Sequence, residues 1–241
     1  MPAPRMPAHP DAPPVAEPVL MCWSGGKDSA LALHAARQDP ALRVTALMTT
    51  VTEGFERISM HGVRCTLLVE QAEALGLPLE QVRIPIQASN ALYEEAMGRL
   101  LARYRSHGVA RVIFGDLFLE DIRRYRERQL AALDMRGIFP LWLKDTPQLA
   151  RDFIAMGFRA ILVCVDPKQL DPSFCGRDFD DRLLADLPPT ADPCGERGEF
   201  HTFVYDGPIF RRPLEVARGE VVQRDGFWFC DLACAEGPGG P

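Results

Sequence analysis

A short apolar run followed at once by a polar, glycine-containing turn is the first clear pattern along the chain. Residues 19–23 (VLMCW) have the composition of a strand buried on both faces, and residues 24–29 (SGGKDS) form the turn. The following residues, 30–37, are rich in Ala and Leu, which favours a helix. These segments predict a strand, a tight turn and a helix in direct succession.

The alternation of strand-like and helix-like segments continues to about residue 133. We expect further strands at 42–51, 81–85 and 111–115, and helices at 63–75, at 90–106 with Asn90 as the N-cap, and at 119–133. Regular alternation is typical of α/β proteins with a doubly wound parallel sheet, whose ligands bind beyond the carboxyl ends of the strands. The turn at residues 24–29 follows one such end, and Gly115-Asp116 follows another.

The turn at residues 24–29 has the chemistry of a phosphate-binding site. Gly25 and Gly26 allow backbone N–H groups to converge, and the start of the helix adds unpaired donors and a partial positive charge. The turn also carries two hydroxyls, a carboxylate and a full positive charge, from Ser24, Ser29, Asp28 and Lys27. The alternative is a purely structural turn in which the glycines only allow the chain to bend. Such a turn would have no need of Lys27 flanked by Ser24 and Asp28. The spacing differs from that of a Walker A P-loop, which has four residues between its first Gly and a Gly-Lys pair.

The composition changes near residues 137–144 (GIFPLWLK). Beyond that segment we expect helices at 147–156 and around 179–187, and strands at 160–165, 200–205, 214–222 and 227–231. We therefore divide the chain into a nucleotide-binding domain (18–136) and a second, smaller α+β substrate domain (137–232). Residues 1–17, rich in Pro and Ala, are expected to be a disordered extension, and residues 233–241 a flexible tail.

The overall composition narrows the classes of partner. The net charge of −6 provides no basic surface, so we expect no nucleic-acid partner. No apolar run approaches about 18 residues, so we expect no membrane association. The seven cysteines contain no C-x-x-C pair, which favours reduced thiols in a cytoplasmic protein over a zinc site, even at Cys230 and Cys234.

Two junctions between predicted elements carry charged side chains. The segment 115–121 (GDLFLED) places three carboxylates at a strand-to-helix junction, where they would cap the helix or contact ribose, Mg²⁺ or substrate. Further along that helix, Arg124 and Arg126 would either reach a phosphate or substrate carboxylate or lie on a solvated face. His61 and Arg64, at a loop-to-helix junction, would touch substrate or serve helix entry.

The segment 192–202 (DPCGERGEFHT) is the second most informative stretch. Turn chemistry explains Gly195 and Gly198 but not the combination of Glu196, Glu199 and His201. Glu and His are the residue types that orient an amine or move a proton near neutral pH. A metal site built from these three side chains is an alternative, although their spacing matches no established pattern.

Together, SGGKDS, GDLFLEDIRRYRE and DPCGERGEFHTFVYDGPIF resemble the diphthine–ammonia ligase family of the PP-loop ATP pyrophosphatases. SGGKDS marks the whole superfamily, whereas C-G-E-x-G-E followed by an aromatic residue and then Thr is much more specific. The likeness covers residues 19–231 and looks like the shorter bacterial-type branch. It implies a Rossmann-like PP-loop fold.

The resemblance also implies an ATP-dependent ligase that forms an amide. A substrate carboxylate would attack the α-phosphate of ATP and release pyrophosphate, and ammonia would then displace AMP, with ATP and Mg²⁺ as cofactors. From the resemblance and the residue chemistry together we expect catalytic roles for Lys27, Asp116, Glu196 and Glu199. We expect ATP to be bound by Ser24, Gly25, Gly26, Lys27, Asp28, Ser29 and Gly115. We expect substrate to be bound by Asp121, Arg126, Gly195, Gly198, His201 and Thr202.

Several alternatives stay open at this point. One is a sensor that binds ATP or AMP without turnover, although the Glu-rich third motif would then have no use. Another is amidation of a small molecule such as a corrinoid precursor, and a third is tRNA modification, which the acidic charge and the missing C-x-x-C pairs oppose. The sequence identifies neither the carboxylate acceptor nor whether the chain forms a homo-oligomer.

Overall fold

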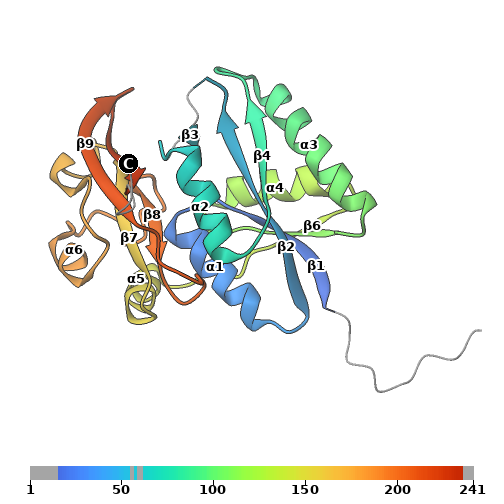
Figure 1. The fold of residues 1–241 in the computed structure, drawn as a ribbon, viewed down its shortest axis with the longest axis horizontal. Helices are drawn as coiled ribbons and strands as arrows, with labels where there is room; N and C mark the ends of the chain where they lie inside the picture. The colour runs from blue at the N-terminus through green and yellow to red at the C-terminus, as the bar shows by residue number, and fades with distance from the viewer. Residues whose placement is uncertain (1–15, 55–56, 59–61, 236–241) are drawn as a thin grey trace, which may run out of the picture.

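Two sheets, one mainly parallel and one antiparallel, form the framework of the protein (Figure 1). The structure is a computed structural model that describes residues 16–54, 57–58 and 62–235. The first sheet and its helices comprise β1 (Glu17–Cys22), α1 (Lys27–Gln38), β2 (Leu42–Thr52), β3 (Arg57–Ile58), α2 (Cys65–Leu75), β4 (Leu79–Ile84), α3 (Asn90–Ser106), β5 (Arg111–Ile113), α4 (Glu120–Ala131) and β6 (Arg136–Ile138). The remainder comprises α5 (Thr146–Ala155), β7 (Arg159–Val165), the 3₁₀ helix η1 (Pro172–Phe174), α6 (Asp181–Asp186), β8 (Phe200–Asp206), β9 (Val216–Arg224) and β10 (Phe227–Cys234).

The parallel strands of the first sheet follow the order β4-β2-β1-β5-β6, and β3 pairs antiparallel with the end of β2. The chain therefore builds outward from β1 in one direction and then returns to its other side at β5. Such a reversal opens a crevice at the carboxyl ends of the two central strands, which is where doubly wound folds bind ligands. The second sheet, ordered β8-β7-β10-β9, is antiparallel throughout. The predicted fold class is confirmed.

Strand β1 is buried on both faces, as its apolar run predicts. Val19 and Met21 belong to the core beneath α1 and α2, whereas Leu20 belongs to a second core beneath α3 and α4. The first core continues into the second sheet and its helices through side chains such as Phe153 and Phe200. The two sheets are therefore packed through one continuous core, which holds the crevice in place between them.

Two local features differ from the sequence-based expectation. Helix α3 does begin at Asn90, but its N-cap is Ser89, whose Oγ accepts a hydrogen bond from the N–H of Leu92 at 3.3 Å. The assignment of Asn90 as the N-cap is thus wrong by one residue. Strand β6 was not predicted, because three residues are too few to show a period. It pairs with β5 and includes Gly137 and Ile138, which lie beyond the predicted division at residue 136.

The described residues also bear on the broader expectations. None of the helices described is long and apolar enough to span a membrane. All seven cysteines lie within the described ranges and have free thiols, including Cys230 and Cys234. Most of the expected N-terminal extension and C-terminal tail lies outside the described residues.

Candidate active site

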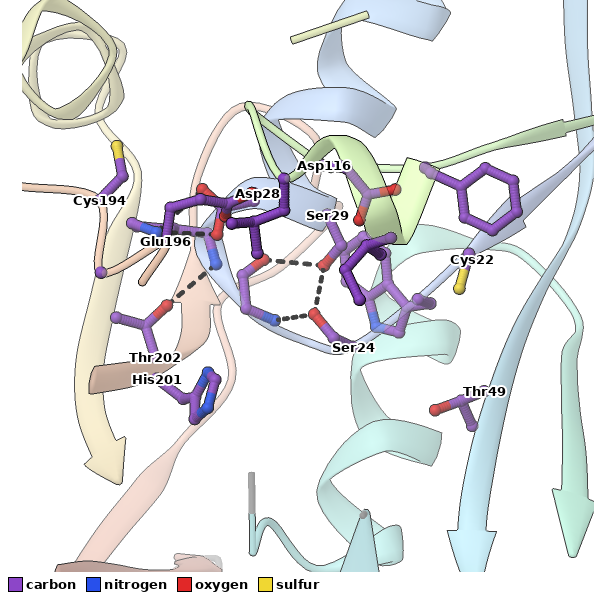
Figure 2. Close-up of a pocket in the computed structure, with 18 of the residues that line it drawn as sticks. Cys22, Ser24, Asp28, Ser29, Thr49, Asp116, Cys194, Glu196, His201 and Thr202 are labelled. Carbon is purple, nitrogen blue, oxygen red and sulfur yellow. Dashed lines mark hydrogen bonds and ion pairs between the residues drawn. The ribbon is translucent and has the colours of Figure 1, made fainter. Parts of the chain in front are cut away.

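A cavity of about 650 Å³ lies at the carboxyl ends of β1, β2 and β5, facing β8 of the second sheet (Figure 2). Its walls come from the turn at residues 24–29, the end of β2, the facing sides of α3 and α4, the segment after β5, and the loop that leads into β8. A volume of this size is typical of sites for small molecules and cofactors. The three motifs selected from the sequence therefore meet at one cavity.

The turn between β1 and α1 is held by hydrogen bonds to its own hydroxyls. The Gly26 N–H donates to Ser24 Oγ at 3.3 Å, and Ser29 Oγ donates to the Gly26 carbonyl at 2.8 Å. Gly25 has a φ of +78°, which an L side chain rarely adopts. The result is a tight turn at the amino end of α1, the geometry that places N–H donors toward an anion.

Strand β8 packs directly against this turn. The Lys27 N–H donates to Thr202 Oγ1 at 3.0 Å, and the Val204 N–H donates to the Gly25 carbonyl at 2.9 Å. A Cβ on Gly26 would lie 3.0 Å from the Thr202 carbonyl oxygen, so any larger residue would require the strand or the turn to shift by a few tenths of an ångström. Thr202, expected at the substrate, therefore also anchors the turn.

Gln71 on α2 is a fully buried side chain that ties these parts together. Its Oε1 accepts a hydrogen bond from Trp23 Nε1 at 2.9 Å, while its Nε2 donates to the carbonyls of Gly25 at 3.0 Å and Val204 at 2.6 Å. The sequence-based selection missed Gln71. A polar residue between Leu67 and Leu75 on an otherwise apolar helix face was the signal available.

Lys27 places a positive charge in the cavity wall although its side chain is almost completely buried. Its Nζ lies 2.9 and 2.8 Å from the two carboxylate oxygens of Asp28, and 5.8 Å from the centre of the Phe200 ring. Burial by itself lowers the pKa of Lys27, but Asp28 and neighbouring groups such as Glu196 outweigh burial and raise it. Lys27 is therefore charged at neutral pH.

The loop before β8 is held by two carboxylates that point into it. Asp192 accepts hydrogen bonds from the Cys194 N–H at 2.8 Å and from Thr146 Oγ1 at 2.7 Å. Glu199 accepts from the Asp192 N–H at 2.7 Å and from the Arg197 N–H at 3.0 Å. Glu199 is only 1% exposed and is not part of the cavity wall, so its geometry is that of a residue that shapes the loop.

Glu196, from the same loop, does face the cavity. Its Oε1 accepts a hydrogen bond from the Leu117 N–H at 2.9 Å, which joins the loop to the segment after β5. Burial, helped by the negative charges of Asp28 and Asp116, raises the pKa of Glu196 to about 7, although the Leu117 N–H and Lys27 oppose the change. Glu196 can therefore take up or release a proton near neutral pH.

His201 lies in the same wall and behaves differently from Glu196 (Figure 2). Burial, together with the charge of Lys27, lowers the pKa of His201 to about 4. The imidazole is consequently neutral at neutral pH, and it can donate or accept a hydrogen bond without adding charge.

The segment after β5 contributes a partly buried ion pair. Arg126 Nη2 lies 3.1 Å from Asp116 Oδ1, and Arg126 Nε lies 2.8 Å from Asp116 Oδ2 but without hydrogen-bond geometry. The guanidinium of Arg126 also lies 4.5 Å from the centre of the Phe114 ring. Gly115, expected to allow approach of the nucleotide, lies in the cavity wall, and because a Cβ there would lie 2.8 Å from backbone atoms of Asp28, Gly115 also makes room for α1.

The cavity wall contains most of the residues selected from the sequence. These are Ser24, Gly26, Lys27, Asp28, Ser29, Gly115, Asp116, Arg126, Gly195, Glu196, Gly198, His201 and Thr202. The wall does not include Gly25, Asp121 or Glu199, and Asp121 is exposed on the first turn of α4. Arg64 is paired with Asp231 rather than with the cavity, and His61 lies outside the described residues. The selection missed Asp192, Thr146 and Arg197 as well as Gln71.

The described side chains offer no dedicated metal cage. No group of three or more His, Cys, Asp or Glu side chains within residues 16–54 and 62–235 could hold a metal ion, which argues against a site at Glu196, Glu199 and His201. Mg²⁺ that arrives with a nucleotide needs only one or two carboxylates beside the phosphates. Asp28, in the turn itself and in the cavity wall, fits that requirement.

Comparisons with known proteins agree with the two-part architecture. Residues 18–136 match the family described as diphthamide synthase N-terminal domain, and residues 145–235 match the diphthamide synthase C-terminal domain. A Schizosaccharomyces pombe protein named diphthine–ammonia ligase is 28% identical over 234 residues, which cover 89% of this chain but 38% of the yeast protein. The mouse protein of the same name is 25% identical over 192 residues, covering 76% of this chain and 70% of its own length. The human protein is 30% identical over 121 residues, covering 48% and 45% respectively.

Proposed function

Because this chain belongs to the diphthamide synthase family, we propose that it is an ATP-dependent ligase that joins ammonia to an acceptor carboxylate. One observation carries the proposal. The glycine turn with Lys27 and the loop with Glu196 line a single cavity, so a phosphate site and a proton-transfer group lie together. Since the chain spans 38% of the yeast relative's length, the activity of that protein is extended to this chain only as a proposal.

The proposed reaction has two steps. A carboxylate oxygen of the acceptor bonds to the α-phosphorus of ATP, the bond between that phosphorus and the bridging oxygen breaks, and pyrophosphate leaves with the electron pair. Ammonia nitrogen then bonds to the acyl carbon and loses a proton, the bond between that carbon and the oxygen that bridges to phosphorus breaks, and AMP leaves with the electron pair of that bond. Both steps build negative charge on a leaving phosphate, which fixed N–H donors and a nearby cation stabilise.

In this scheme the turn at residues 24–29 binds the β- and γ-phosphates. Lys27 stabilises the departing pyrophosphate, because it is charged and already held at the amino end of α1. Mg²⁺ bound beside Asp28 would supply further neutralisation of phosphate charge when present. Asp116 and Arg126 form the wall next to the turn, where the ribose or the acceptor would lie.

Glu196 and His201 serve the ammonia step. Glu196 accepts the proton that the attacking nitrogen loses, since a group with a pKa near the working pH does so most efficiently. His201, neutral at that pH, orients the amine or the acyl oxygen by hydrogen bonding. Glu199 and Asp192 position the loop that carries these groups and take no part in proton transfer.

The proposal is tested by incubating the purified chain with ATP, ¹⁵N-ammonium and a metabolite extract, and by repeating the reaction with extracted protein as the acceptor pool. A ligase releases AMP and pyrophosphate and forms a ¹⁵N-labelled amide in one of the two pools. Release of ADP contradicts the proposal, and ATP binding without turnover favours a sensor. The pool that acquires the label decides between a small-molecule acceptor and a protein acceptor.

A further inference from the structure

Three cationic side chains line the cavity, and among the described ion pairs only two of them have an acidic partner. Charged Lys27 is paired with Asp28, whose carboxylate oxygens lie 2.9 and 2.8 Å from its Nζ, and Arg126 is paired with Asp116. The third cation in the wall is Arg197. Among the ion pairs of the described residues, none involves Arg197, so its charge is the one that a ligand can use without displacing a partner.

The backbone that carries Arg197 is fixed. Its N–H donates to Glu199 Oε2 at 3.0 Å, and the Gly198 N–H donates to the Gly195 carbonyl at 3.1 Å. Gly195 and Gly198 both have positive φ values, of +68° and +90°, so the tip of the loop is a defined turn. The side chain of Arg197 is therefore presented from a rigid support, directly after Glu196.

Arg197 is exposed and lies near one aromatic ring. Its guanidinium lies 6.0 Å from the centre of the Phe118 ring. Leu119 and Ile122, which line the same cavity, are 38% and 43% exposed. A cavity that is lined by a cation and by large exposed apolar side chains is suited to a ligand that has an apolar body and an anionic end.

We propose that Arg197 is a specificity-determining residue that binds the carboxylate of the acceptor, so that the acceptor is a carboxylic acid with an apolar body. This inference rests on the proposed function, because it assigns the acceptor side of that site. A guanidinium matches a carboxylate with two parallel N–H donors, which favours the charged acid over any neutral analogue of equal shape. Arg197 acts in binding, before any bond changes: it holds the carboxylate of the acceptor in the cavity that also contains the turn at residues 24–29.

The test compares two probes of nearly equal shape, phenylacetate and phenylacetamide, on protein saturated with α,β-methylene-ATP. Isothermal titration or ligand-observed NMR should show that the unaltered chain binds phenylacetate at least about tenfold more tightly, the size expected for one charge-assisted contact. Arg197→Gln should bring the two dissociation constants together without changing the affinity for the ATP analogue. Arg197→Lys should restore part of the preference, since it keeps the charge and loses the fork. Arg124→Gln, at an exposed arginine paired with Glu120 outside the cavity wall, is the matched control and should leave the preference intact.

Two results would overturn the assignment. One is equal binding, or no binding, of the two probes by the unaltered chain. The other is a tenfold or greater loss of analogue affinity in Arg197→Gln, which would make Arg197 a phosphate ligand. The ligase proposal is judged separately by release of AMP and pyrophosphate: a chain that discriminates the probes through Arg197 but releases neither product retains the carboxylate site and refutes the ligase.

Discussion

Replacing Gln71 by Leu should destabilise the protein and should also lower its activity, because Gln71 helps to hold the turn at residues 24–29. Leu has a similar size but cannot hydrogen bond, so the change leaves little cavity and removes three bonds. Trp23 Nε1 then has a buried N–H without its acceptor, and the Val204 carbonyl loses a donor at 2.6 Å. The Gly25 carbonyl keeps the Val204 N–H at 2.9 Å and is the least affected.

The size of the effect follows from these orphaned groups. A buried donor or acceptor without a partner costs about 1–3 kcal/mol. The Trp23 N–H loses its acceptor completely and the Val204 carbonyl loses one donor, so we expect the free energy of unfolding to fall by about 3 kcal/mol. For a chain of this length that corresponds to a fall in Tm of about 6–12 °C. Because the Gly25 carbonyl loses one of the two hydrogen bonds that it accepts, the turn is held less firmly, and AMP formation should fall by about 10–100-fold beyond the loss expected from unfolding.

Urea unfolding gives the free energy, and a pyrophosphate-release assay well below the Tm gives the activity. Gln148→Leu is the control, because Gln148 is exposed on α5 and its side chain bonds only to neighbours on its own helix among the described contacts. If the free energy of unfolding of Gln71→Leu lies within about 0.5 kcal/mol of that of the unaltered chain, and the variant retains full activity, the three bonds do not support the turn and the reasoning fails.

Other residues of the site give four further predictions. Lys27→Ala should lower pyrophosphate release by about 10²–10³-fold, because the charge beside the leaving group is lost, while circular dichroism shows an intact fold. The rate of amide formation should rise as the pH increases through about 7, because Glu196, whose pKa is raised in the folded protein, becomes deprotonated. The rate of Glu196→Gln should show no inflection near pH 7. The titration of ammonium affects both proteins equally and so does not account for the difference. The same raised pKa means that the stability contributed by protonated Glu196 is lost as pH rises from 4.5 to about 7, so Glu196→Gln should narrow the stability difference between these pH values. Gly115→Ala should destabilise the chain by about 1–3 kcal/mol in thermal unfolding, because its Cβ would lie 2.8 Å from the Asp28 backbone, whereas Gly98→Ala, with nothing within 4 Å, should be neutral or stabilising.

Much of the fold could be predicted because it depends on patterns that local sequence carries. The apolar run at 19–23, the Ala- and Leu-rich segment after it and the regular alternation that follows each identify an element without reference to the others. Strand β6 could not be found in this way, since its pairing with β5 defines it and three residues show no period. The predicted N-cap of α3 was Asn90 instead of Ser89, because both residue types cap helices equally well.

The site was predictable in kind but not in the direction of its side chains. Lys27 and Glu196 were selected for their chemistry, and both lie in the cavity wall. Glu199 was selected for the same reason, but its carboxylate turns inward to hold the loop, and only the fold decides which of two glutamates three residues apart faces the ligand. Gly115 lies in the cavity wall as expected of a ligand contact, but its second role, making room for α1, could not be predicted, because both roles require the same missing Cβ.

The two halves of the site are joined to each other by hydrogen bonds. The phosphate turn belongs to the first sheet, yet its Lys27 N–H and its Gly25 carbonyl are bonded to Thr202 and Val204 of the second. The loop with Glu196 belongs to the second part, yet it is bonded to the Leu117 N–H of the first. Each half therefore positions a functional group of the other, and the continuous core beneath them resists separation. In the proposed two-step reaction, such mutual support would keep the geometry for the attack by ammonia in place once the acyl-adenylate has formed.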